Sequence, residues 1–201
     1  KLINEVSALN SECRFSITTN AHWKLNSYIK DHLDKINIKD MILSVDSLDP
    51  GIFAKIRKKG NLEIVLENIE RIISYSDDRV KRGLSQIPLS LNFLVQKDNW
   101  HEVKDVLGFC QEKGIRPFIT FCYVPSEHSP LDLSERERRR ILNYYFETMD
   151  PKRLDNYVRV LKPLIKSLNK LDRAVYLSHM RELGVCWSAP LGENGREYNF
   201  R

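Results

Sequence analysis

Polar side chains that could bind a ligand stand at the end of the apolar run 41–45. They are Ser44, Asp46 and Ser47. A hydroxyl both donates and accepts hydrogen bonds, and a carboxylate offers fixed acceptors. These residue types suit a ligand that carries hydroxyls together with an amine or a carboxylate.

A β-α unit positions these side chains. Residues 41–45 form an apolar run of strand length, and a basic turn at 57–60 leads into a stretch with helical spacing of apolar residues. Ligands of parallel β-α structures bind at the carboxyl ends of the strands, which is where the polar residues lie. The alternative is that Asp46, Ser47 and Asp49 only turn the chain before a proline. The residues alone leave both interpretations open.

The same plan repeats along the chain. Apolar patterns predict four strands, at 15–18, 41–45, 89–95 and 118–124. Helices are predicted over 25–36, after Gly60, and from Asn99 to a closing Gly114. Asn99 and Glu102 have the spacing of a capping box, and the polar stretch 74–86 is predicted to be a loop. Alternating strands and helices imply a parallel sheet with right-handed connections, hence an α/β fold.

Helices are predicted to dominate after residue 130. Ser134 and Glu137 have the spacing of a second capping box, and a helix starting at Asp150 and Pro151 should kink or end at Pro163. A further helix is predicted over 171–183, ending at Gly184. Asn194 and Gly195 indicate a tight hairpin turn.

Composition restricts the possible functions. The chain has 201 residues, of which 42% are hydrophobic and 29% charged, as in an ordinary soluble domain. No apolar run approaches the length of a membrane span, and no signal-peptide pattern opens the chain, so we expect a cytoplasmic protein without a membrane partner. The net charge of +5 is spread out, and the arginines at 136–140 alternate with acids. That pattern is typical of a solvated helix face, and we expect no nucleic-acid partner.

The four cysteines do not form a recognisable site. Cys13, Cys110 and Cys122 fall within apolar patterns and are predicted to be small core residues. No two cysteines have the close spacing of a zinc site or a redox dithiol. The chain opens with Lys1 inside a helix-like pattern, so we expect it to be a piece of a longer protein.

Five segments, taken in order, resemble the radical S-adenosylmethionine superfamily. They are ITTNA at 17–21, SVDS at 44–47, IRKKGNLEIVLENI at 56–69, LNFLVQKDNWHEV at 91–103 and PFITFCYV at 117–124. The resemblance covers about residues 11–130 and implies units three to six of a partial (β/α) TIM-like barrel. It divides the chain into an incomplete core barrel at 1–130, helices at 131–183, and the start of a C-terminal extension at 184–201.

The resemblance implies an enzyme with two cofactors. In this family a 4Fe–4S cluster and S-adenosylmethionine together generate a 5′-deoxyadenosyl radical that abstracts hydrogen from a substrate. The cluster motif CxxxCxxC and a glycine-rich motif are both missing and are expected before Lys1, so we expect this segment alone to be inactive. Implied partners are a small-molecule or peptide substrate, in peptide modification or enzyme activation, and flavodoxin or ferredoxin as electron donor. The alternatives are a binding module without a cluster and a non-radical β/α enzyme.

The resemblance also assigns cofactor-binding residues. The matching positions are Thr19, Asn20, Ser44, Asp46, Arg57, Asn92 and Tyr123. Arg57 would bind the methionine carboxylate through its forked donors, or else would be a surface arginine at the start of a helix. Asn92 could instead bond a core hydroxyl, and Tyr123 could be a core aromatic. Asn99 is predicted to cap a helix rather than bind a ligand. Ala21 replaces the family's glycine, so no positive-φ turn is expected there.

Cys186 follows the predicted helices at the place where family members with a SPASM or twitch extension begin to bind auxiliary clusters. The sequence CWSAPLGENGREYNF resembles that opening, although no second cysteine follows in it. Cys186 is therefore a candidate metal ligand, and the alternative is a buried, inert thiol.

Overall fold

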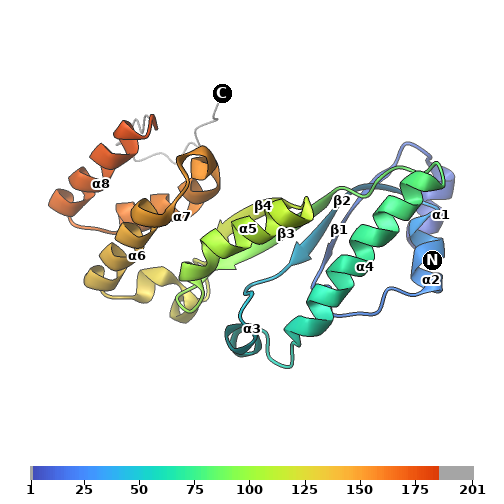
Figure 1. Ribbon diagram of the computed structural model, residues 1–201, viewed down its shortest axis with the longest axis horizontal. Coiled ribbons are helices and arrows are strands. Elements are labelled where there is room, and N and C mark those ends of the chain that lie inside the picture. Colours follow the sequence, from blue (N-terminus) through green and yellow to red (C-terminus); the bar gives the residue numbers. More distant parts are fainter. Residues whose placement is uncertain (1, 186–201) are drawn as a thin grey trace.

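The protein has a four-stranded parallel sheet with helices along one face and a helical group beyond its last strand (Figure 1). The computed structural model describes residues 2–185. The strands lie in chain order: β1 (Arg14–Thr19), β2 (Asn37–Ser44), β3 (Leu89–Val95) and β4 (Arg116–Phe121). Each neighbouring pair is parallel. This arrangement confirms the predicted α/β fold, a partial β/α barrel followed by helices.

Helices connect the strands and follow the sheet. Those before β4 are α1 (Leu2–Leu9), α2 (Ser27–Leu33), α3 (Pro50–Ile56), α4 (Leu62–Lys81) and α5 (Val103–Lys113). After the sheet come α6 (Glu135–Thr148), α7 (Leu154–Lys166) and α8 (Lys170–Glu182). Figure 1 shows α4 and α5 running along the sheet, with α6–α8 gathered at the far end of the molecule. Among the described residues, no helix is long and apolar enough to cross a bilayer.

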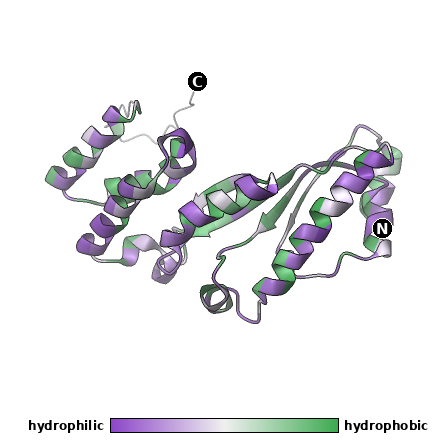
Figure 2. Ribbon diagram, viewed as in Figure 1, coloured by the Kyte–Doolittle hydropathy of each residue, from purple (hydrophilic) through white to green (hydrophobic). Residues whose placement is uncertain are grey.

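One face of the sheet is apolar because alternate strand residues point toward α4 and α5. Its fully buried members include Met41, Leu43, Val45, Leu91, Phe93 and Val95. Figure 2 shows hydrophobic colouring concentrated on the central strands, whereas the helices carry both kinds of residue. Ser44 and Asn92 alternate with the apolar residues and pair directly in the register of β2 and β3. The opposite face of the sheet is therefore the one that presents polar side chains.

Several predicted boundaries are wrong. The predicted loop at 74–86 is helical up to Lys81, because the polar side chains of Ser76 and Arg79 are buried with hydrogen-bond partners and continue the inner face of α4. Strand β4 ends at Phe121 rather than at residue 124. Helix α7 continues through Pro163 and ends at Lys166, so this proline does not end the helix, and the alternative of a kink stays a prediction.

The predicted helix ends fare differently. The capping box of Ser134 and Glu137 is confirmed, and Gly114 closes α5 with a φ of 65°. The capping box predicted for Asn99 and Glu102 is wrong, since neither side chain caps the short 3-10 helix there; both reach other loops. The hairpin predicted at Asn194 and Gly195 lies outside the described residues.

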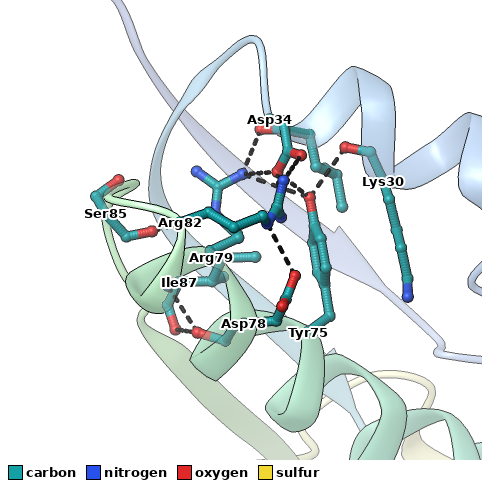
Figure 3. Close-up of polar contacts among 10 residues, drawn as sticks. Lys30, Asp34, Tyr75, Asp78, Arg79, Arg82, Ser85 and Ile87 are labelled. Atoms are coloured by element: carbon teal, nitrogen blue, oxygen red, sulfur yellow. Dashed lines mark hydrogen bonds and ion pairs between the residues drawn. The ribbon is translucent and has the colours of Figure 1, made fainter.

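An ionic network built around the buried Arg79 joins the end of α2 to the end of α4 (Figure 3). Arg79, whose side chain is 2% exposed, donates to Asp34 Oδ1 at 2.8 Å and to the Leu33 carbonyl at 2.9 Å. Arg82 contacts the other oxygen of Asp34, and the Tyr75 hydroxyl lies against the same carboxylate. The Asp34 carboxylate thus accepts hydrogen bonds from two guanidinium groups and a phenol.

This network makes stability depend on acid pH. Burial acts to raise the pKa of Asp34, but hydrogen bonds from Arg82 and Tyr75, with the charges of Arg82 and Arg79, hold it below its usual 3.8. The folded state therefore binds this proton more weakly than the unfolded state does. The stabilisation is present above about pH 4 and is lost as the pH falls through the lowered pKa.

Asp34→Asn should consequently lower the free energy of unfolding near neutral pH, with a deficit that shrinks below about pH 4. Urea unfolding of both proteins over a series of pH values measures this. A deficit that stays constant into acid would contradict the assignment.

Candidate cofactor-binding site

A depression of about 460 Å³ opens at the carboxyl ends of β1 and β2. Its lining consists of Asn20, His22, Ser44, Phe53, Ile56, Arg57, Lys58, Lys59 and Gly60. Three of the residues expected from the sequence to bind a cofactor, Asn20, Ser44 and Arg57, therefore lie around one hollow. They come from the ends of β1 and β2 and from the turn after α3.

An ion pair holds Arg57 at this depression. Its Nε donates to Asp46 Oδ2 at 2.6 Å, and the Asp46 side chain is only 4% exposed. The other oxygen, Oδ1, accepts the backbone N–H of Leu94 at 3.3 Å. Within residues 2–185, neither Nη group of Arg57 has a hydrogen-bond partner. Asp46 thus orients the arginine without using its terminal donors.

The lining is basic. Arg57, Lys58 and Lys59 all contribute to it, whereas no carboxylate does. The turn that carries them is tight, because Lys59 has a φ of 65° and the Gly60 N–H donates to the Arg57 carbonyl at 2.7 Å. A ligand with a carboxylate or another anionic group fits this lining.

The turn after β1 is built by side chains that bond its backbone. Thr19 Oγ1 accepts from the Trp23 indole at 2.6 Å and from the Ala21 N–H, so it shapes the turn and is not in the lining. Ala21 has a φ of 53°, so the expectation that alanine excludes a positive-φ turn is wrong. The Asn68 amide donates to the Ala21 carbonyl at 3.1 Å, which helps to hold this unfavourable conformation.

Asn92 and Tyr123 are not part of the lining. Asn92 Oδ1 accepts from the Thr120 hydroxyl at 3.2 Å, as in the alternative that gave it a hydroxyl partner. Tyr123 follows β4, is 59% exposed and packs edge-on against Phe121. The alternative of a core aromatic is therefore wrong for Tyr123. Cys186 lies outside the described residues.

The described cysteines do not form a metal site. Burial raises the pKa of the Cys110 thiol to about 12, which disfavours the thiolate that a metal requires. Cys122 is also buried, and Cys13 is half-buried. No group of three or more His, Cys, Asp or Glu side chains within residues 2–185 could hold a metal ion. An iron–sulfur cluster does not fit this part of the chain.

The sequence pattern does not show how the residues behind the site support it. Ser47, Asn99 and Glu102 are buried and bond one another's loops. Asp49 caps α3 through the Ile52 N–H, so the interpretation of Ser47 and Asp49 as turn residues holds, whereas Asp46 serves Arg57. The spacing of Asn99 and Glu102 favours a helix cap and gives no sign of these contacts between loops.

Comparison with known proteins gives a partial likeness. No protein-family model matches the chain. A probable GTP 3′,8-cyclase of Methanocaldococcus jannaschii is 29% identical over 99 residues, which cover 49% of this chain and 30% of the relative. A probable GTP 3′,8-cyclase of Methanococcus maripaludis is 32% identical over 102 residues, with the same coverage. The chain thus matches less than a third of the length of these curated relatives. The likeness supports the resemblance to the radical S-adenosylmethionine superfamily.

Proposed function

We propose that this chain forms the part of a radical S-adenosylmethionine enzyme that binds the methionyl and ribosyl groups of the cofactor. The observation that carries the proposal is that Asn20, Ser44 and Arg57 line one basic depression at the carboxyl ends of β1 and β2. GTP 3′,8-cyclases are radical S-adenosylmethionine enzymes, so the likeness to the two archaeal relatives supports it as well.

The donor set fits the cofactor. The two Nη groups of Arg57 can receive the methionine carboxylate, while Ser44 and Asn20 offer a hydroxyl and an amide to the amine or the ribose. Together with a cluster, bound S-adenosylmethionine supplies a 5′-deoxyadenosyl radical for hydrogen abstraction. The cysteines for that cluster would come from outside the described residues, and in our proposal they precede Lys1.

Arg57→Lys tests the role of the terminal donors. A lysine can still pair with Asp46, but its single ammonium then has no fork for a ligand carboxylate. We expect S-adenosylmethionine to bind this variant roughly tenfold more weakly, with the melting temperature nearly unchanged. Titration of the 201-residue chain, followed by backbone NMR, measures the affinity and places the shifts.

Arg71→Lys is the matched control, because Arg71 is also half-exposed and paired with a carboxylate, Glu67, but lies on α4 outside the depression. It should leave the affinity unchanged. Equal affinities for the wild type and Arg57→Lys would remove Arg57 from the site.

Two other classes of protein make different predictions. A module without a cluster would bind S-adenosylmethionine, yet its complete gene would lack CxxxCxxC. A non-radical β/α enzyme would not bind the cofactor at this depression. Sequencing the gene upstream of Lys1, together with the titration, separates the three.

The substrate and partners belong to the intact enzyme of this proposal. The names of the relatives add GTP to the small-molecule and peptide substrates to be assayed. Flavodoxin or ferredoxin would deliver the electron, and the cytoplasm would be the location. The chain alone, reconstituted with iron and sulfide and given dithionite and cofactor, should form no 5′-deoxyadenosine, because its described residues hold no cluster site. Appreciable product would contradict this.

A further inference from the structure

The loop 46–49, which follows β2, is held by two side chains from the turn after β3. Asn99 Nδ2 donates to the Asp46 carbonyl at 2.6 Å and to the Leu94 carbonyl at 3.0 Å. Glu102 accepts from the Leu48 N–H at 2.6 Å and lies within 2.9 Å of the Ser47 hydroxyl. Asn99 and Glu102 therefore hydrogen-bond three successive residues, 46–48, of the neighbouring loop.

These contacts are buried and lack a charge partner. Asn99 is fully buried and Glu102 is 5% exposed. Within residues 2–185, Glu102 has no ion pair; its carboxylate is satisfied by hydrogen-bond donors of the loop alone, including the Asp49 N–H at 3.3 Å. Such a carboxylate loses its partners if the loop moves, so the position of the loop is strongly fixed.

The held loop leads directly to Arg57. Asp46 is fixed through its carbonyl by Asn99 and through Oδ1 by the Leu94 N–H, which leaves Oδ2 aimed at Arg57 Nε. Helix α3 lies between Asp46 and Arg57, so the ion pair closes a segment that is anchored at its first residue. The placement of Arg57 at the depression thus depends on the turn after β3.

We propose that Asn99 and Glu102 are positioning residues that hold Arg57 toward the anionic group of its ligand, an inference that rests on the proposed function. Among the described residues, neither side chain forms a hydrogen bond to a residue of the lining, and both act through Asp46 and the loop. Their role is distinct from a general contribution to folding, because it predicts a change at Arg57 in particular.

Asn99→Asp is the sharper variant, since it turns the amide donor into an oxygen that faces the Asp46 and Leu94 carbonyls. Glu102→Gln is the milder one, because it removes the charge and puts an N–H where the loop supplies donors. Asp34→Asn is the matched control. It weakens a network before β2, at the other end of the strands, and should lower stability without affecting Arg57.

Two readouts are needed on the full chain. The first is the side-chain ¹⁵N–¹H signal of Arg57 Nε, identified by its loss in Arg57→Lys and protected from water exchange by Asp46. The second is the affinity for S-adenosylmethionine. We expect both site variants to lose the protected signal and to bind roughly tenfold more weakly or worse, as outer-shell changes often do.

The outcomes separate the inference from the function on which it rests. A lowered melting temperature with the Arg57 signal and the affinity intact would overturn the positioning role. The same loss of affinity in Asp34→Asn would overturn it too. If the wild type does not bind the cofactor, the proposed function fails. The Arg57 signal then tests the positioning role of Asn99 and Glu102 without the affinity measurement. Its persistence in both variants then overturns the inference, and its loss supports positioning toward another anion.

Discussion

Arg79→Met should lower the free energy of unfolding by about 3 kcal/mol, near the low end for a broken buried pair, because Asp34 keeps Arg82. Methionine fills much of the same space without the donors. The Leu33 and Ser85 carbonyls would lose the bonds that Arg79 supplies at 2.9 and 3.1 Å. Urea unfolding near neutral pH measures the change.

Arg82→Met is the control, since it removes another arginine from the same carboxylate. Arg82 is 43% exposed, so solvent screens its ion pair and water can replace it. We expect a clearly smaller loss than for Arg79→Met. Similar losses for the two variants would mean that burial does not distinguish them, and the role of Arg79 as the central donor in Figure 3 would be wrong.

The sequence was sufficient for the sheet but not for the end of α4. Strands such as β3 can be predicted because the apolar residues within the segment itself indicate that it is buried. Residues 74–81 are polar, and their burial depends on Asp34, which lies far away in the sequence. The spacing of residues within α4 cannot reveal Asp34 as a partner, because only the folded structure brings it close to Arg79.

The sequence indicates residues that line the depression but not the residues that hold them in place. Ser44 could be chosen because ligands gather at the ends of parallel strands, whereas Arg57 was chosen only from the resemblance to a known family. Asn99 and Glu102 could not, since their spacing also suits a helix cap and only the packing of two loops shows which contact forms. Ala21 adopts a positive φ, which alanine normally avoids, because Thr19 bonds its N–H and Asn68 bonds its carbonyl.

Gly60→Ala should damage both the stability and the site. An added Cβ would lie 2.8 Å from Phe53 Cε1 and 2.9 Å from the Arg57 carbonyl oxygen. Phe53 is buried and the other atom is backbone, so neither can move aside cheaply. We expect a loss of about 2 kcal/mol in the free energy of unfolding. The turn would also shift Arg57, weakening S-adenosylmethionine binding by roughly tenfold if that residue receives the carboxylate.

Gly108→Ala is the matched control, because its Cβ would meet nothing within 4 Å and it lies inside α5. Replacing a helix-interior glycine by alanine should stabilise the protein by about 0.5–1 kcal/mol and leave the affinity unchanged. Replacing glycine by alanine should therefore lower the free energy of unfolding at Gly60 and raise it at Gly108. Thermal melts and cofactor titrations of both variants test this. If Gly60→Ala is as stable as the wild type, then the turn at 57–60 is loose, and a fixed Arg57 cannot be the basis of the depression's selectivity for anions.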